Sequence, residues 1–281
     1  MSYGWTIVII MVVVAALSIL GVFNPLTFAP KASPGSCQLT RPFGAGTTVQ
    51  LDLSGTCNNQ IPKYVASFTK IDSQNINTGQ VLISSSVTQF TISLWMYVPS
   101  SMTFSGDQML AGEGGSGGNG VGALALGSNE VYFGYECNGN NGGVPIKTDT
   151  WYHVVGVYGS GFGTTYVNGI DSTHGSFNLG PNQNFTIGNG GVGCNASPQP
   201  FGGYISNVQV YDSALSEADV RALYNEGIGG APIDLKDLVA WYPLNGDTYD
   251  YSGNKYHGSQ LNVTYTNAWY NDYKQPSINV T

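Results

Sequence analysis

The stretch that decides the fold is residues 90–98, FTISLWMYV, in which large apolar side chains recur at every second position. Residues 151–158 (WYHVVGVY) and 204–211 (YISNVQVY) belong to the same pattern, and segments rich in Gly, Asn, Ser and Pro separate such runs. A period of two is typical of β-strands, so these runs predict an antiparallel sandwich. Asn168-Gly169 directly follows a further run and predicts a hairpin, because both residues tolerate a positive φ.

One helix is expected after the last of these runs. Ser216 can cap it, and Glu217 and Asp219 favour its positive end. Gly227 can end it. The remainder of the body is predicted to be strands and turns, which makes the fold class mainly β.

Composition excludes several classes of function. The chain has 281 residues, 9 Lys or Arg and 17 Asp or Glu, which give a net charge of −8 and a charged fraction of 9%. Binding of nucleic acid or of an anionic membrane surface needs clustered cations, so neither partner is expected. A hydrophobic fraction of 42% is too high for intrinsic disorder.

The N-terminus carries a second signal. Residues 5–23, WTIVIIMVVVAALSILGVF, contain no charge and would span roughly 28 Å as a helix, about the thickness of a bilayer core. We expect residues 1–25 to form a hydrophobic helix that must be buried in lipid or in neighbouring helices. The residues expected to make its contacts are Trp5, Ile9, Val12, Val13, Ala16, Leu20 and Phe23. The alternative is a cleaved signal peptide, whose apolar core normally has about 7–15 residues.

The charges that flank this run indicate a different location for the large domain from the one indicated by the cysteines and glycosylation sequons described below. No Lys or Arg precedes it, whereas Lys31 and Arg41 follow it, which would place the large domain in the cytoplasm. The conflict disappears if Met1 follows a basic leader that was removed. Whether Met1 is the translated start stays open at this point.

The residues around the run carry a resemblance. Ser2-Tyr-Gly-Trp5, the β-branched run, Leu20-Gly-Val-Phe-Asn-Pro25 and residues 28–37 are similar to the N-terminal region of archaeal type IV pilin-like proteins with class III signal peptides. The resemblance implies a helix that first sits in the membrane and then forms the core of a homopolymeric filament. It implies an extracellular, cell-surface location after assembly.

Cysteines and glycosylation sequons also point outside the cell. Cys37, Cys57, Cys137 and Cys194 contain no C-x-x-C pair, which disfavours a zinc or redox site and favours disulfides. Three connectivities are open, and we favour Cys37–Cys57 and Cys137–Cys194 because each would lie within one structural unit. Sequons occur at Asn184, Asn195, Asn262 and Asn279.

A second resemblance covers the body of the chain. The residues that carry it are Phe90-Thr-Ile-Ser-Leu-Trp95, Thr150-Trp-Tyr-His-Val-Val155, Tyr166-Val-Asn-Gly169, Ile187-Gly188, Phe201-Gly-Gly-Tyr-Ile205, Val210-Tyr-Asp-Ser-Ala-Leu-Ser-Glu217 and Ala222-Leu-Tyr-Asn-Glu-Gly227. Residues 64–229 are thereby similar to the laminin G-like, concanavalin A-like jelly-roll family. This resemblance implies a two-sheet jelly roll that binds carbohydrate or serves as an adhesion spacer.

The expected organisation therefore has four parts. They are a helix at 1–25, a linker and disulfide-bonded β segment at 26–63, the jelly roll at 64–229, and a C-terminal β segment at 230–281. Residues 238–246 and 250–258 resemble the segment that usually opens such a jelly roll, but here they come last. The C-terminal segment is expected to pack on the sandwich, to complete a small accessory β unit with residues 35–64, or to donate a strand to a neighbouring subunit.

Asp250 and Asn254 are the candidate metal ligands. They offer oxygen atoms in a turn, and related jelly rolls often hold a structural calcium near this motif. The alternative, which we favour, is turn chemistry in which both side chains bond their own backbone. No other cofactor is expected.

Aromatic side chains near the C-terminus are the candidate contacts to sugar. Tyr249, Tyr251, Trp269, Tyr270 and Tyr273 can stack on sugar rings or pack against a neighbouring subunit. The sequence leaves both alternatives open.

Catalytic chemistry is not expected. His153 lies inside an apolar strand, where a core role outweighs catalysis, and Glu113, Glu130 and Glu136 form no recognised pair of catalytic carboxylates. The Gly-rich stretch 112–122 lacks the Lys and Ser or Thr of a phosphate loop.

Two functions follow as expectations. The favoured one is a pilin-like subunit of an archaeal extracellular filament with an outward lectin-like domain for surface adhesion. The alternative is a monomeric, membrane-anchored glycan-binding adhesin. The expected partners are other copies of the chain, glycans, and the membrane before assembly.

Overall fold

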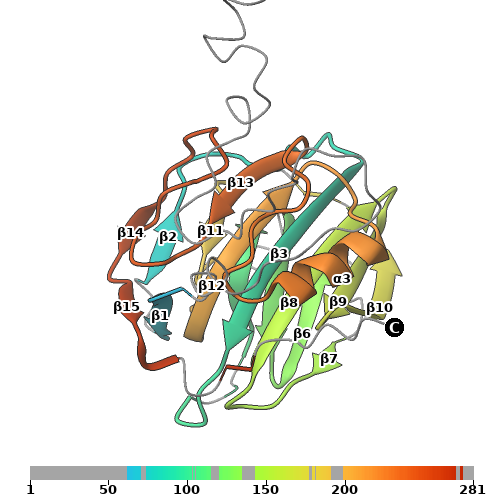
Figure 1. Ribbon diagram of the computed structural model, residues 1–281. Coiled ribbons are helices and arrows are strands. Elements are labelled where there is room, and N and C mark those ends of the chain that lie inside the picture. The colour runs from blue at the N-terminus through green and yellow to red at the C-terminus, as the bar shows by residue number, and fades with distance from the viewer. Residues whose placement is uncertain are drawn as a thin grey trace, which may run out of the picture. The chain divides into compact units, whose positions relative to one another are not determined.

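Two antiparallel sheets stack face to face and enclose a hydrophobic core (Figure 1). The computed structural model describes residues 62–70, 74–102, 104, 106–114, 120–134, 143–176, 179–180, 182–190, 199–269 and 273–274. The chain divides into two units, Met1–Cys57 and Asn58–Thr281, and all described residues belong to the second.

The first sheet contains eight of the described strands. Its order is β10 (Ile170–Ser176), β9 (Phe162–Val167), β8 (Trp151–Gly159), β3 (Gln89–Tyr97), β12 (Gly202–Tyr211), β1 (Val65–Thr69) and β15 (Thr264–Thr266), with β13 (Leu238–Tyr242) paired to β12. The strand β3 covers most of the stretch 90–98 and lies in the middle of this sheet. The antiparallel sandwich predicted from the two-residue period is therefore confirmed.

The second sheet contains seven of the described strands. Its order is β14 (Ser259–Leu261), β2 (Asn75–Asn77), β11 (Thr186–Ile187), β4 (Gln108–Gly114), β5 (Gly120–Gly127), β6 (Glu130–Gly134) and β7 (Val144–Pro145). Most of its strands are shorter than those of the first sheet.

The N-terminal predictions fall outside this part of the chain. The helix expected over residues 1–25 and all but the last two residues of the linker and β segment expected over 26–63 are not among the described residues. Within the part that is described, no helix combines the length and the hydropathy needed to cross a bilayer.

The C-terminal strands join both sheets of the same chain. β13 pairs with β12, β15 pairs with β1, and β14 pairs with β2. Packing of the segment on the sandwich was one of the expected arrangements. The sandwich therefore continues past residue 229, at least to Trp269, which is fully buried.

The helix α3 (Glu217–Glu226) begins and ends where its capping signals predict. The Ser216 hydroxyl accepts a hydrogen bond from the Asp219 N–H at 3.2 Å, and the Asp219 carboxylate accepts one from the Ser216 N–H at 3.1 Å. Gly227 ends the helix with a φ of 83°. The buried side chains Val220 and Leu223 pack on the outer face of the eight-stranded sheet, in front of β8 and β9 in Figure 1.

The hairpin between β9 and β10 also follows its turn signal. Asn168 and Gly169 have φ angles of 53° and 75°, the left-handed values that a two-residue turn of this kind requires. The Asn168 side chain accepts a hydrogen bond from the His153 N–H at 3.0 Å, which ties the turn to β8.

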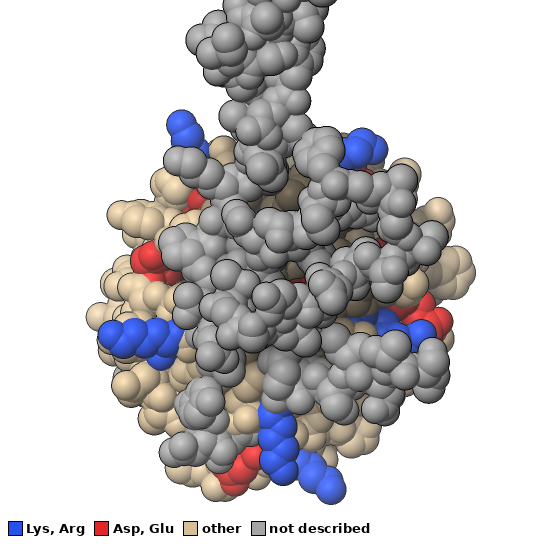
Figure 2. Space-filling model, in the orientation of Figure 1, with Lys and Arg blue, Asp and Glu red and all other residues tan. Residues whose placement is uncertain are grey.

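Charged side chains are sparse on the sandwich. Lys and Arg side chains are scattered over the face shown in Figure 2 rather than gathered into one patch. Arg221–Glu217 and Lys236–Asp237 form ion pairs on the surface, and His174 Nε2 lies 3.0 Å from Asp171 Oδ1. Ion pairs of this exposed kind contribute little to stability.

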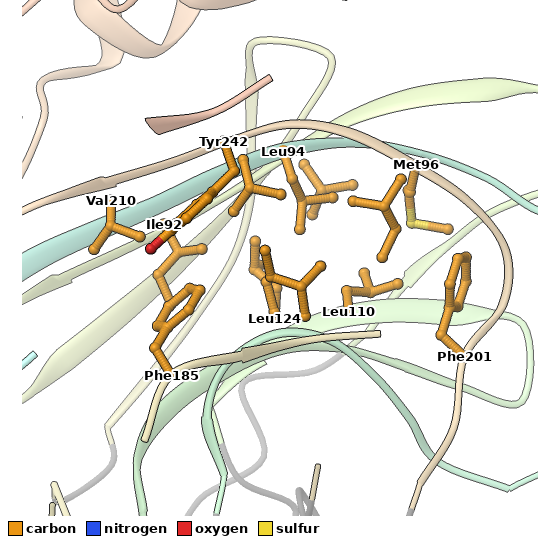
Figure 3. Close-up of a cluster of buried hydrophobic side chains, with 14 of the residues drawn as sticks. Ile92, Leu94, Met96, Leu110, Leu124, Phe185, Phe201, Val210 and Tyr242 are labelled. Carbon is orange, nitrogen blue, oxygen red and sulfur yellow. The ribbon is translucent and has the colours of Figure 1, made fainter. Parts of the chain in front are cut away.

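The core lies between the two sheets. Alternate residues of β3, namely Phe90, Ile92, Leu94 and Met96, point into it, as the two-residue period requires. Figure 3 shows Ile92, Leu94 and Met96 together with side chains from other elements, namely Leu110, Leu124, Phe185, Phe201, Val210 and Tyr242. The opposite face of β3 carries Trp95 and Tyr97, which belong to a separate aromatic cluster outside the sandwich.

Candidate functional site

The loop between β13 and β14 presents two exposed aromatic rings. Tyr249 is 57% exposed and Tyr251 is 42% exposed, so both rings are accessible to a ligand. Tyr249 meets the exposed ring of His257 edge-on, with 5.0 Å between centroids. We call Tyr249, Tyr251 and His257 the tyrosine platform.

Asp247 holds both tyrosines of the platform. Its Oδ1 accepts a hydrogen bond from the Tyr249 N–H at 3.1 Å, and its Oδ2 accepts one from the Tyr251 hydroxyl at 3.0 Å. The Tyr251 ring also meets the buried Trp241 edge-on at 6.2 Å. Sequence reasoning missed this role of Asp247, although an Asp two residues before Tyr249 is a turn signal.

Asp250 anchors the loop to the sandwich. Its Oδ1 accepts hydrogen bonds from the N–H groups of Trp241 and Ser252, both at 2.9 Å. Its Oδ2 accepts from the Tyr256 N–H at 3.0 Å and from the Ser252 hydroxyl at 2.9 Å. The Asp250 N–H donates to His257 Nδ1 at 3.1 Å, which fixes the third ring of the platform. The loop therefore holds its rings in place before any ligand arrives.

The predicted calcium ligands are engaged in turn chemistry. Both Asp250 oxygens face N–H or O–H donors, and the Asn254 amide donates to the Val239 carbonyl at 2.9 Å. In the described part of the chain, no group of three or more His, Cys, Asp or Glu is arranged to hold a metal ion. Calcium ligation by Asp250 and Asn254 stays a prediction, which a calcium titration would test.

His153 is buried beneath helix α3. Its Nε2 lies 2.9 Å from the Ser93 hydroxyl, and its ring lies beside those of Trp95 and Tyr224, with centroid distances of 5.2 and 6.1 Å. Burial lowers the pKa of His153 to about 3, so the ring is neutral at physiological pH. A neutral ring without solvent access fits the core role expected from the sequence.

Glu113 is a buried carboxyl group that anchors a loop. Its Oε1 accepts hydrogen bonds from the N–H groups of Leu82 and Ile83 at 2.6 and 2.7 Å. Burial raises the pKa of Glu113 to about 7, against the opposing effect of these hydrogen bonds. Glu130, in contrast, is exposed on β6, and Glu136 lies outside the described residues.

A family comparison identifies the fold. A model described as the concanavalin A-like lectin/glucanases superfamily matches residues 70–221, which is more than half of the 281 residues. The chain belongs to this superfamily. The jelly-roll resemblance is thereby confirmed over residues 70–221. The match does not extend to residues 1–69, so the pilin-like resemblance of residues 2–37 stays a prediction.

A solved structure shares the sandwich fold. A protein from Bacteroides ovatus to which carbohydrate binding is attributed is 20% identical, with a TM-score of 0.53, over 73% of this chain and 60% of its own. This chain thus spans less than two thirds of that protein's length, and the likeness shows the fold alone. A comparison with curated protein sequences gives no match.

Two further structures are more distant. A mutant Trypanosoma rangeli sialidase displaying trans-sialidase activity is 21% identical, with a TM-score of 0.41, over 51% of this chain and 24% of its own. The native heptameric SAP-like pentraxin from Limulus polyphemus is 17% identical, with a TM-score of 0.43, over 59% of this chain and 83% of its own. Both TM-scores are too low to support a conclusion about the chain described here.

The remaining candidate residues divide between the surface and the undescribed part of the chain. Asn184 and Asn262 are exposed, as acceptors for glycan must be. Trp269, however, is only 1% exposed, and Tyr273 is half-buried against it, so the expectation that these two rings are available to sugar is wrong. The residues outside the described part are Cys37, Cys57, Cys137, Cys194, Asn195, Asn279, Tyr270 and the contact residues of the N-terminal helix.

Proposed function

We propose that this chain is a cell-surface carbohydrate-binding protein and that the tyrosine platform contacts the sugar. The single observation that carries the proposal is the pair of exposed rings, Tyr249 and Tyr251, on a loop of a lectin-like fold. An aromatic ring offers a flat apolar face to the C–H groups of a pyranose, and the Asp247 carboxylate, which is bonded to the Tyr251 hydroxyl, supplies a polar group beside it. The site is therefore suited to a hydroxylated, partly apolar ligand.

The rigidity of the loop supports binding. The Asp250 hydrogen bonds fix the loop backbone, and Asp247 fixes both tyrosines. A site that is ordered before binding loses less conformational entropy when the ligand arrives.

Charge favours a neutral glycan. The chain carries a net charge of −8, and its Lys and Arg side chains are scattered in Figure 2. An acidic sugar would be repelled by this field, whereas a neutral sugar would not. We therefore expect neutral hexoses or N-acetylhexosamines.

The proposed role is binding without catalysis, outside the cell. His153 and Glu113 are buried and engaged by other groups, so neither is placed to act on a substrate at the platform. The apolar run 5–23 would hold the domain at the membrane, and the four sequons and four cysteines fit an extracellular location.

Glycan-array binding of the full chain in detergent micelles tests the proposal. We expect Tyr249→Ala/Tyr251→Ala to weaken binding to the best neutral glycan at least tenfold. Phe162→Ala is the matched control, because Phe162 is also an exposed ring, at 62%, but lies on the hairpin of β9 and β10. A blank array with and without calcium, or equal losses in both variants, would overturn the proposal.

A filament subunit is the second candidate function. It rests on the charge-free run 5–23, whose small and β-branched residues permit close packing of helices. We expect Val13→Asp to abolish fibres, because a carboxylate in a helical bundle would be desolvated. Negative-stain microscopy checks this, and normal fibres from the variant would exclude the pilin-like role.

A further inference from the structure

The outer face of the eight-stranded sheet carries a row of aromatic rings. Trp151, Tyr97 and Tyr204 lie opposite one another on the adjacent strands β8, β3 and β12. The Tyr97 ring lies 5.4 Å from that of Trp151 and 5.4 Å from that of Tyr204, which it stacks at 11°. We call these three residues the aromatic row.

A short piece of the C-terminal segment covers this row. Trp269 meets Trp151 edge-on at 6.0 Å, and Tyr273 meets Trp95, beside the row, edge-on at 5.5 Å. Trp269 is 1% exposed and Trp151 is 6% exposed. We call Trp269 and Tyr273 the cover. The other half of this sheet face is covered by α3.

The strand that leads into the cover is attached at the edge of the sheet, whereas the Trp269 side chain itself is fully buried. This strand, β15, pairs with β1 over three residues. The Tyr273 hydroxyl accepts a hydrogen bond from the Ile228 N–H at 2.9 Å. Displacement of the cover would therefore leave the central strands and α3 in place, as local opening of a terminal segment does.

The covered face has a polar group that its cover does not satisfy. The indole nitrogen of Trp151 is buried and has no hydrogen-bond partner among the described residues. At the same face the Tyr97 hydroxyl donates to Asp149 Oδ1 at 3.2 Å, and Asp149 is exposed at the rim. A buried N–H without an acceptor is unfavourable, so a ligand that brings a hydroxyl to Trp151 would have an advantage over the cover.

We propose that the cover is displaceable and that the uncovered aromatic row is a second glycan-binding face, for a neutral oligosaccharide chain. The proposal rests on the carbohydrate-binding function proposed above. Flat rings in a row can stack on consecutive pyranose rings. The sugar hydroxyls can accept a hydrogen bond from the Trp151 indole N–H and donate one to the Asp149 carboxylate at the rim. The same segment from a second copy would reproduce the contacts of the cover and leave the Trp151 nitrogen unpaired, so a glycan fits this face better.

The cover lowers the apparent affinity of the face it hides. A ligand that binds only the open state is weakened by the fraction of molecules that are open, and a substitution that loosens the cover removes this penalty. Trp269→Ala should therefore increase the affinity of the aromatic row. The ligand does not need a new contact for this gain.

Affinity measurements in a background without the tyrosine platform test the proposal. Full-length Tyr249→Ala/Tyr251→Ala protein in detergent micelles is titrated with cellohexaose, laminarihexaose, chitohexaose and mannohexaose. Adding Trp269→Ala should tighten binding to at least one hexasaccharide tenfold or more, and adding Trp151→Phe as well should remove the gain. Tyr273→Phe, which loses only the acceptor for Ile228, should give a smaller gain. Tyr265→Phe is the control and should give none, because its hydroxyl contacts Gln260 away from the row.

The outcomes separate the two proposals. Loss of binding on removal of the platform tests the first function, whereas the gain in its absence tests the cover alone. A folded Trp269→Ala protein that shows no gain, or that forms dimers in light scattering instead of binding sugar, overturns the second glycan face. If Trp269→Ala does not fold, the Tyr273→Phe protein decides: a gain in affinity that the Tyr265→Phe control lacks supports the proposal, and unchanged binding overturns it.

Discussion

Glu113 shows how a single buried acid makes stability depend on pH. Its carboxyl group accepts two backbone N–H groups, and burial raises the pKa to about 7 from the ordinary 4.5. The folded state therefore binds more protons than the unfolded state between these values, and the contribution of Glu113 to stability falls as the pH rises from 4.5 through 7.

We expect Glu113→Gln to remove this dependence. The free energy of unfolding of the unsubstituted protein, measured relative to that of the Glu113→Gln protein, should fall by on the order of 2–3 kcal/mol between pH 4.5 and pH 8. Urea unfolding of both proteins across this range measures the difference. Parallel stability curves would show that Glu113 does not titrate near neutral pH.

Asp250 is the residue on which the tyrosine platform depends. Asp250→Ala would leave the buried N–H of Trp241 and the N–H groups of Ser252 and Tyr256 without their acceptor. We expect a loss of roughly 2–4 kcal/mol in the free energy of unfolding and a parallel loss of glycan affinity. Urea unfolding and affinity electrophoresis measure the two effects. The exposed Asp212→Asn is the control, and a variant as stable as this control would contradict the anchoring role.

At the scale of elements, α3 depends on its capping box. Ser216→Ala removes the acceptor for the Asp219 N–H and should cost about 1 kcal/mol of stability. Because α3 covers half of the outer sheet face, this loss should appear in global thermal unfolding rather than as local fraying. The exposed Ser259→Ala on β14 is the control. Equal melting temperatures of the two variants would exclude a contribution from the cap.

At the scale of the whole molecule, the low charge density calls for another source of solubility. Charged residues make up 9% of the chain, and bulky sugars at sequons would cover apolar surface that charges leave open. We expect glycan on at least one of Asn184, Asn195, Asn262 and Asn279, and both disulfides formed. Peptide mass spectrometry of protein from its native source checks this. Four free thiols and four unmodified asparagines would reject the extracellular location.

Local features of the fold were predictable from the sequence. The alternation in residues 90–98, the Asn168-Gly169 turn and the ends of α3 each depend on spacing and on residues within one turn of chain. Short-range sterics and hydrogen bonds decide such features wherever the segment lies. The exposed tyrosines of the platform were also among the predicted sugar contacts.

Long-range packing determines which aromatic rings are exposed. Tyr249 and Trp269 belong to similar C-terminal stretches, yet one is exposed on a loop and the other is buried on Trp151, more than a hundred residues earlier in the chain. Burial depends on contacts between strands that are distant in sequence, and residue type and spacing do not contain these contacts. The same reason applies to Glu113, whose pKa is raised by burial, against the hydrogen bonds from Leu82 and Ile83, some thirty residues earlier in the chain.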